Sequence, residues 1–176
     1  MAEMVSLKKC LPGDLQLLQN ICTSIYPIYF GDHWEGPGLE LYLEEQFSME
    51  RMNQDLEDPR IGYFFICLQH KPVGFLKVNY EAPFEGFDRG TTSELEKMYI
   101  LPEHKGQGLG KISLERLVEI LAQKGKKALF LCVLDSNPGG FRFYQKMGFV
   151  FQRADKLKYI HFKKELRGLK FMYKSI

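Results

Sequence analysis

The sequence predicts one mixed α/β domain. Some segments repeat apolar residues at three- and four-residue steps, while others are continuous β-rich runs, so helices and strands alternate along the chain. Residues 94–134 read as strand, loop, helix and strand, a crossover unit that usually joins parallel strands. The length of 176 residues suits a single domain with a full core, and no repeat, linker or low-complexity segment divides it.

Composition excludes several classes of protein. The chain is 45% hydrophobic and 26% charged, which is typical of a soluble globular protein. No segment approaches the ~18–20 apolar residues of a membrane span, and the start "MAEMVSLKKC" lacks the apolar run of a secretory signal. We therefore expect no membrane partner, and no nucleic-acid partner either. The histidines are isolated and we propose no metal site. The scattered cysteines are interpreted as reduced core residues, which favours the cytoplasm: Cys10, Cys22, Cys67 and Cys132.

The first third reads as one strand followed by helices. Residues 5–10 form a short strand, and Asp14 is the expected N-cap of a helix that Pro27 should kink or end. Residues 31–38 form a loop, and residues 39–57 look helical again. The first helix has one apolar face, made of Leu15, Leu18, Cys22, Ile25 and Tyr29. In the second helical segment the candidates for burial are Leu39, Tyr42, Leu43, Phe47 and Leu56.

The middle of the chain changes to a β pattern. Residues 62–68 and 73–80 suit a hairpin joined by "QHKP". A Gly/Pro/Thr loop over 82–93 leads to a further strand over 94–101, which Pro102 stops.

The last third returns to helices between strands. A helix from Leu109 buries Leu114, Leu117, Val118 and Leu121 and ends with Gly125 as C-terminal cap. After an apolar strand over 127–134, Asn137 and Pro138 offer an N-cap and a first helical position, and the short helix ends at Gly148. Residues 149–153 are extended, and one or two final strands lie around Gly168.

The stretch "HKGQGLGKIS", residues 104–113, fits neither familiar nucleotide motif. A P-loop would need glycine at Lys105 and a hydroxyl residue at Ile112. A Rossmann turn would need a third glycine where Lys111 stands, and "PEHK" separates the strand from the glycines, where that turn is tight.

The same stretch suits another phosphate. Glycines let phosphate oxygens approach the backbone, and the free N–H groups of the first helical turn point at such a ligand. Lys105 and Lys111 bracket the loop with positive charge. The alternative is a flexible, glycine-rich start of a helix.

Two motifs in order carry a family resemblance. "MYILPEHKGQGLGK", then a helix, a strand ending near Asn137 and "FYQKMGF", resemble the GNAT family of N-acetyltransferases over residues 60–150. That family's loop is [RQ]-x-x-G-x-[GA]; Lys105 replaces the usual Arg or Gln, whereas Gly108 and Gly110 match it. The resemblance implies a GNAT-like α/β (α+β) domain over residues 1–176, with a mixed, mostly antiparallel, twisted sheet of about six or seven strands and helices on both faces.

A narrower likeness suggests the acceptor. "FFICLQHKPVGFLKVN", "ELEKMYI", "GLGK" and "FYQKMGFV" are similar to bacterial PaiA-type spermidine/spermine acetyltransferases. The resemblance implies acetyl-CoA as donor, a small polyamine as acceptor and direct attack on the thioester. Acetylation of a protein or peptide amino group, and a non-catalytic acyl-CoA-binding module, remain alternatives. The sequence does not fix the oligomeric state, so a homodimer stays open.

The resemblance implies which residues hold the donor. The strand around Tyr99 would lend backbone groups of Met98 and Ile100 to the pantetheine arm and the thioester carbonyl, although both side chains also suit core packing. Asn137 would lie near the cofactor arm or merely cap its helix. The pyrophosphate would be held by Lys105, Gly106, Gln107, Gly108, Leu109, Gly110 and Lys111.

Three residues are candidates for the chemistry. Tyr144 matches the family's proposed general acid to the leaving thiolate, but proton transfer from an ordinary tyrosine is uphill by roughly 2 kcal/mol. Unless its environment tunes its pKa, it therefore acts mainly as a hydrogen-bond donor; the alternative is an aromatic that packs between helix and sheet. An alkylammonium must lose a proton before attack, at a cost of about 4–5 kcal/mol at pH 7. Glu94 and Glu96 lie two residues apart and point to the same side of their strand. Either would be the base, directly or through water, unless it is merely an exposed residue of the strand.

Acceptor recognition is assigned to the N-terminal helices and their loop. Residues 32–58 hold nine acids against Arg51 alone, a balance of −8 in a chain of net charge +2, which suits a cationic partner unless these acids are merely solvated. An aromatic and acidic cluster within or beside this region would bind an amine by charge and cation–π contact: Tyr29, Asp32, His33 and Trp34.

Overall fold

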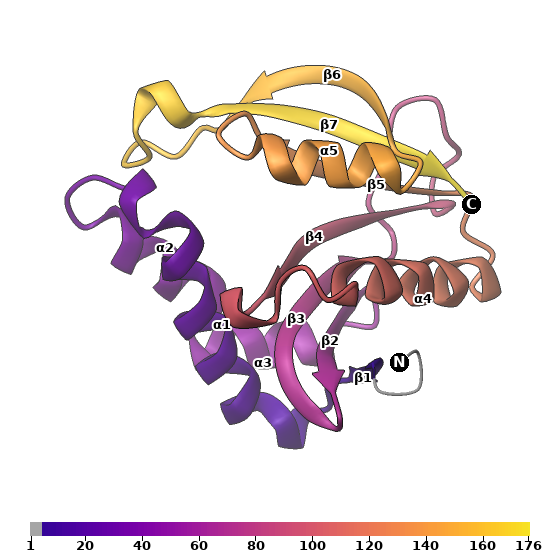
Figure 1. The fold of residues 1–176 in the computed structure, drawn as a ribbon, viewed down its shortest axis with the longest axis horizontal. Helices are drawn as coiled ribbons and strands as arrows, with labels where there is room; N and C mark the ends of the chain where they lie inside the picture. Colours follow the sequence, from indigo (N-terminus) through magenta and orange to yellow (C-terminus); the bar gives the residue numbers. More distant parts are fainter. Residues whose placement is uncertain (1–4) are drawn as a thin grey trace.

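The computed structural model describes residues 5–176, so the first four residues of the segment used to judge a secretory signal lie outside the described part. Within these residues, seven strands form one sheet in the order β1-β2-β3-β4-β5-β7-β6. All neighbours pair antiparallel except β4 and β5, which are parallel (Figure 1). The expected mixed sheet and its parallel crossover are confirmed. The strands are β1 Val5–Lys9, β2 Ile61–Leu68, β3 Lys71–Asn79, β4 Thr92–Ile100, β5 Ala128–Leu134, β6 Val150–Lys156 and β7 Gly168–Ser175.

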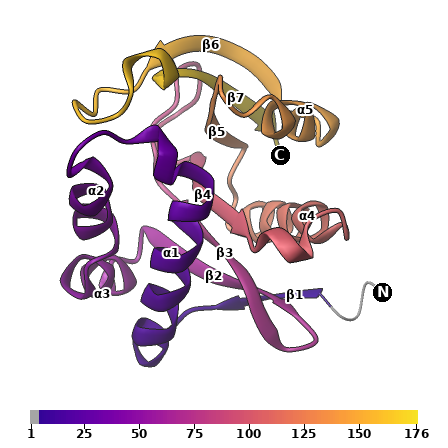
Figure 2. The ribbon, with the colours of Figure 1, turned by 60° about the vertical axis from the view of Figure 1, so that its left-hand side comes forward.

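Helices cover both faces of the sheet, as expected. Figure 2 shows α1, α2 and α3 on one side and α4 and α5 on the other. The helices are α1 Leu15–Phe30, α2 Gly38–Phe47, α3 Met49–Glu57, α4 Leu109–Gln123 and α5 Pro138–Lys146. Among residues 5–176 no helix is both long and apolar enough to cross a bilayer.

Alternation along the strands builds a core on each face. Phe75 packs with the cluster under α1–α3, whereas its neighbour Leu76 packs with the cluster under α4. Likewise Phe65 and Phe64 of β2 belong to opposite clusters. The central strands are therefore apolar on both faces, which explains their continuous hydrophobic runs.

The first two helical predictions need correction. Of the two outcomes expected at Pro27, a kink or an end, the end is wrong: the helix continues one turn to Phe30, because proline lacks its own N–H but its carbonyl still accepts from the N–H of Gly31. The single helix expected over 39–57 is two helices, because Ser48 is extended and its hydroxyl caps α3 by accepting from the N–H of Arg51 at 3.3 Å. The carboxylate of Asp14 accepts from the N–H of Leu11 rather than from the first turn of α1.

The later elements agree more closely with expectation. The side chain of Asn137 accepts from the N–H of Gly140 at 2.9 Å and caps α5. Of the one or two strands expected at the end of the chain, the structure has one, β7, and it begins at Gly168. Three cysteines are buried and all four are free thiols, but Cys132 is exposed because it alternates to the less covered face of β5.

Candidate active site

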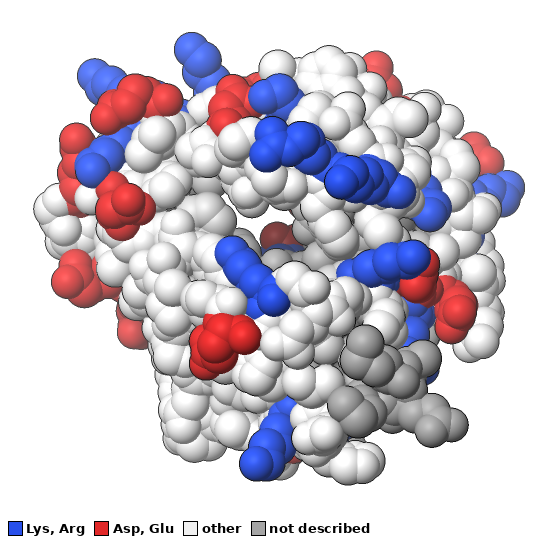
Figure 3. Space-filling view, in the orientation of Figure 1, with Lys and Arg blue, Asp and Glu red and all other residues white. Residues whose placement is uncertain are grey.

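A cavity of about 750 Å³ opens where the sheet divides. The parallel strands β4 and β5 pair only from Thr92–Glu94 against Ala128–Phe130, and beyond that point they diverge. A β-bulge bends β4 here, because Lys97 faces Lys77 and Leu95 faces Val78, which leaves Glu96 as the extra residue. Figure 3 shows a hollow on this face with basic side chains around it and acidic atoms at its floor.

The glycine loop forms one end of this cavity. Gly106 and Gly108 have φ of 76° and 80°, a conformation that L side chains rarely adopt. No atom of residues 5–176 lies within 4 Å of a Cβ placed on either, so these residues leave the space before the backbone open. The first hydrogen bond of α4 runs from the N–H of Ile112 to the carbonyl of Gly108, so the N–H groups before it have no partner within the helix and can donate to an anion.

The remaining loop residues divide between the ligand side and the core. Lys105, Gly110 and Lys111 line the cavity, and the side chain of Lys111 is largely exposed. Leu109 lines it as well but is buried in the core beside β1, whereas the amide of Gln107 turns back to the carbonyl of Glu103. The basic and glycine residues of the loop therefore fit a pyrophosphate.

Tyr29 joins this loop to β4. Its hydroxyl donates to the carbonyl of Ile100, and the ammonium of Lys105 lies 4.2 Å from the centre of its ring. The side chain expected to recognise the acceptor thus contacts the two segments expected to hold the donor. Tyr29 also lines the cavity.

The edge of β4 that faces the gap toward β5 carries the backbone groups of Met98 and Ile100, which the sequence predicts to hold the donor. The N–H of Leu101 bonds to the carbonyl of Val73, so alternation turns the polar groups of Met98 and Ile100 away from β3, toward the gap. The side chains of Met98 and Ile100 pack on the α4 face, and the ring of Tyr99 packs against α1. Core packing and a backbone role therefore coexist in these residues.

Glu96 is the acidic residue among those that line the cavity. Its Oε2 lies 3.0 Å from Nζ of Lys77, which is only 2% exposed and also lies 2.7 Å from Oδ2 of Asp55. Asp55 in turn accepts from Arg51 at 3.1 Å and from the hydroxyl of Tyr63 at 3.2 Å. Lys77 and Asp55 are buried between the sheet and α3, and through them this chain of charged residues fixes the position of the Glu96 carboxylate.

Glu94 has a different environment. It occupies the last position at which β4 still pairs with β5. Burial, and then the negative charge of Glu96, raise the pKa of Glu94 to about 7, although Lys97 and Lys77 partly offset this. The two carboxylates therefore influence each other. They differ in that Glu96 is paired with Lys77, whereas Glu94 has a raised pKa.

Lys97 lines the same cavity, and sequence reasoning missed it. Simple alternation would place it on the face opposite Glu96, but the bulge turns both residues to the α1–α3 side. Its Nζ donates to Oε1 of Gln46 at 3.1 Å and lies 5.7 Å from the centre of the Phe47 ring. Burial, followed by the charge of Lys77, lowers the pKa of Lys97 to about 8.

The loop after α1 closes one side of the cavity. Nδ1 of His33 lies 2.7 Å from Oδ1 of Asp32, and Nε2 lies 3.1 Å from Oγ of Ser136, a residue that sequence reasoning did not select. Trp34 is buried, with its ring 5.0 Å from those of Tyr42 and Phe162. His33 and Trp34 line the cavity, whereas the side chain of Asp32 is 86% exposed and does not.

An aromatic wall lines the acceptor side of the cavity. It comes from α1, the loop after it, α2 and the segment between β6 and β7, and consists of Tyr26, Phe30, Trp34, Tyr42, Tyr159 and Phe162. Tyr29 and Tyr99 line the cavity beside the donor segments, and Phe143 and Tyr144 line it from α5. Tyr144 comes from α5, packs 5.1 Å from Phe143 and 5.6 Å from Phe149, and has a pKa raised by burial. Asn137 also lines the cavity while it caps α5.

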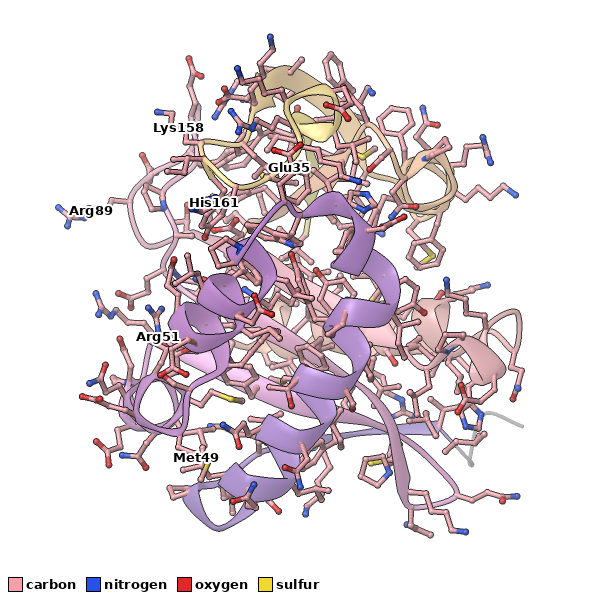
Figure 4. All side chains as sticks on the ribbon, turned by 90° about the vertical axis from the view of Figure 1, so that its left-hand side faces the viewer. Glu35, Met49, Arg51, Arg89, Lys158 and His161 are labelled. Atoms are coloured by element: carbon pink, nitrogen blue, oxygen red, sulfur yellow. The ribbon has the colours of Figure 1, made fainter. Side chains whose placement is uncertain are left out.

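The acidic residues of 32–58 lie elsewhere. None of the nine lines the cavity: Asp55 is buried in the charge chain, and most of the others are exposed on or near α2 and α3. Figure 4 shows Glu35 beside the segment that carries His161. It also shows Arg51, the basic residue among these acids, on α3. The interpretation of these acids as solvated helix faces therefore fits most of them.

Comparison with known proteins identifies the family. Residues 20–149 match the acetyltransferase (GNAT) family, and the chain therefore belongs to it. The solved structure of the PaiA N-acetyltransferase from Thermoplasma acidophilum, in complex with coenzyme A, matches with a TM-score of 0.77 over 98% of this chain and 99% of that one. At 20% identity this likeness shows the fold.

Two curated relatives differ in how much of them the chain covers. A spermidine N(1)-acetyltransferase of Thermoplasma acidophilum is 23% identical over 164 residues, which are 91% of this chain and 97% of that protein. An uncharacterised N-acetyltransferase of Methanocaldococcus jannaschii is 26% identical over 87 residues, which are 49% of this chain and only 38% of that protein. By family, the chain is therefore a member of the GNAT acetyltransferases.

Proposed function

We propose that the chain transfers the acetyl group of acetyl-CoA to a primary amine, and that the acceptor is a small polyamine such as spermidine. One observation carries this proposal: a single cavity joins the glycine loop at one end to Glu96 and an aromatic wall at the other. Donor and acceptor would meet at the exposed edge of β4. The spermidine N(1)-acetyltransferase that aligns over 91% of this chain supports the choice of acceptor class.

The glycine loop would bind the pyrophosphate of the donor. Gly106 and Gly108 leave the backbone open, the first N–H groups of α4 point at the phosphates, and Lys105 adds positive charge. The ring of Tyr29 orients that ammonium. Acetyl-CoA supplies an activated thioester, and these residues would bring it to β4.

The edge of β4 would then polarise the thioester. The N–H groups of Met98 and Ile100 are the available donors for negative charge that develops on the carbonyl oxygen. The hydroxyl of Tyr144 would donate a hydrogen bond to the departing sulfur. Because burial raises the pKa of Tyr144, full proton transfer from it is more unfavourable than from an ordinary tyrosine, so hydrogen bonding is the role we assign.

The two glutamates would divide the work on the amine. Glu96 faces the cavity as a carboxylate held by Lys77 and would attract the ammonium. Glu94 does not line the cavity, but with its pKa of about 7 it would take the proton through water, since a base poised near neutrality serves this purpose best. The aromatic wall would surround the alkyl chain and its charges by cation–π contact.

Steady-state assays with different amines test this proposal. CoA release would be measured with spermidine, spermine, a monoamine of similar length and a lysine-containing peptide, with acetyl-CoA binding followed by calorimetry. We expect kcat/KM for the polyamines to exceed that for the peptide by at least tenfold. Faster turnover of the peptide would favour a protein acetyltransferase. Binding of acetyl-CoA without turnover of any amine would favour a non-catalytic acyl-CoA module.

The chemistry has its own test. Tyr144→Phe should lower kcat by about ten- to a hundredfold with little change in KM for either substrate, since a charge-directed hydrogen bond contributes about 1.5–3 kcal/mol. Tyr159→Phe is the matched control, because Tyr159 lines the same cavity from the segment that follows β6. An unchanged kcat in Tyr144→Phe would remove this residue from the mechanism.

A further inference from the structure

We propose that Lys97 is a site of self-acetylation, at which the protein's own acetyl donor modifies the floor of the acceptor cavity. The inference rests on the proposed function, since it requires acetyl-CoA in this cavity. It adds a modification site and a second acceptor, the protein itself, to that function.

The position of Lys97 carries the inference. It follows Glu96 on β4, and the bulge turns its side chain into the layer between β4 and the N-terminal helices. Lys97 is one residue from Met98, where the donor's carbonyl is proposed to lie, and it lines the same cavity. It is 8% exposed, so contact with reagents in solution is limited to what enters that cavity.

The partners of Lys97 leave its nitrogen available. Within the described residues Lys97 makes no ion pair; its Nζ bonds to the neutral amide of Gln46 at 3.1 Å. Lys77, opposite it on β3, is buried as well but is held by Asp55 at 2.7 Å and Glu96 at 3.0 Å. Carboxylates thus stabilise the charged form of Lys77, whereas the hydrogen-bond partner of Lys97 is a neutral amide.

The electrostatic surroundings favour the neutral amine. Burial and the charge of Lys77 lower the pKa of Lys97 to about 8, against the opposing influence of Glu96, Cys22 and Asp55. Roughly a tenth of the side chain is then neutral at pH 7, whereas an ordinary lysine is neutral in well under a thousandth. Only the neutral amine attacks a thioester.

The step balances without a further reagent. Nζ of the neutral Lys97 forms a bond to the carbonyl carbon of the thioester, and the carbon–sulfur bond breaks. The proton that Nζ loses ends on the departing thiolate, which leaves as CoA, and an amide remains on Lys97. The product has lost the positive charge that would repel a cationic acceptor, so self-acetylation should lower KM for polyamines.

Peptide mass spectrometry after incubation with isotope-labelled acetyl-CoA, without amine, tests the inference. We expect Lys97 to reach at least tenfold higher acetyl occupancy than Lys77, and Lys97→Arg to lose that signal. The rate should rise about fivefold from pH 7 to 8 and less than twofold from 8 to 9, whereas a lysine of ordinary pKa gains about tenfold per pH unit.

The same preparation is assayed for amine acetylation and for acetyl-CoA binding. Turnover of an amine by protein whose Lys97 stays unmodified would overturn self-acetylation and leave the proposed function standing. Absence of acetyl-CoA binding would overturn both. Acetylation spread over exposed lysines, with Lys97 at or below their level, would also overturn the inference.

Discussion

Nζ of Lys77 lies 3.0 Å from Oε2 of Glu96 on the next strand and 2.7 Å from Oδ2 of Asp55 on α3. This buried ammonium therefore joins the bulge of β4 to the helical layer beneath the acceptor end of the cavity. Removing one member of a buried ion pair leaves its partners charged without compensation, which is strongly unfavourable. Lys77 thus connects the stability of the fold with the geometry of Glu96.

Lys77→Met should destabilise the protein markedly. The change removes the shared cation from Asp55, which is buried and keeps Arg51 as a cationic partner, and from Glu96, whose side chain is 23% exposed. We therefore expect the free energy of unfolding to fall by about 3 kcal/mol, the lower end for a broken buried ion pair. Urea denaturation measures this. Lys111→Met is the matched control, since Lys111 is exposed and 4.0 Å from Glu115, and it should change stability by less than about 1 kcal/mol. Similar effects of the two substitutions would contradict the assigned role.

The pKa of Glu94 predicts the acid limb of the pH–rate profile. If Glu94 accepts the proton, kcat/KM for the amine should rise with pH through about 7, and Glu94→Gln should remove that limb. Comparing the two proteins with the same amine cancels the titration of the amine itself. Glu96→Gln should retain the limb and instead raise KM for the amine. The reverse pattern would assign the base to Glu96.

Glu94 also predicts a pH dependence of stability. Its carboxyl titrates near 7 in the folded protein and near 4.5 when unfolded, so between these values the folded state binds more protons. The free energy of unfolding should therefore receive a contribution that is complete below pH 4.5 and lost as pH rises to 7. Denaturation curves from about pH 4.5 to 8 should show this decline in wild type and a weaker one in Glu94→Gln.

Local signals predicted most of the fold. The strand–helix–strand unit over 94–134, the cap at Asn137 and the stop at Pro102 follow from periodicity and from single-residue geometry, and all occur in the structure. The break between α2 and α3 was missed because Ser48 interrupts a continuous helical pattern with one extended residue. A capping serine inside such a pattern is a weak signal unless the chain must turn there.

The acceptor end was less predictable because it depends on a register shift. Alternation places Lys97 opposite Glu96, and only the bulge against Lys77 brings both to one face. The charge chain through Asp55 joins α3, β3 and β4, which are distant in sequence. The donor loop, in contrast, is contiguous, so its glycines and lysines could be recognised from spacing alone.

Tyr29 should affect the donor more than the acceptor. Its hydroxyl bonds to the carbonyl of Ile100 and its ring lies under Lys105, so both contacts order the donor site. Tyr29→Phe should raise KM for acetyl-CoA about fivefold, from the loss of one hydrogen bond of about 1 kcal/mol, and Tyr29→Leu should raise it further. Tyr42→Phe, in the aromatic wall, should instead change KM for the amine. An unaltered KM for acetyl-CoA in Tyr29→Leu would contradict this assignment.

Gly108→Ala separates backbone strain from donor binding. Gly108 has φ of 80° at the N-cap of α4, and no atom of the described part of the chain lies within 4 Å of an added Cβ. The methyl group therefore meets no protein neighbour, but it imposes about 1–2 kcal/mol of backbone strain and fills the space where the phosphates would approach. Gly90→Ala is a close control, because Gly90 has φ of 83° and equally open surroundings but does not line the cavity.

Both alanine variants should unfold at similarly lower urea concentrations, while only Gly108→Ala raises the dissociation constant of acetyl-CoA, by at least tenfold in calorimetry. Because the strain is matched, the difference between the two reports contact between the loop and the donor rather than damage to the fold. Equal affinities in the two variants would show that the donor's phosphates bind away from Gly108, and the pyrophosphate site would then have to be sought elsewhere along the cavity.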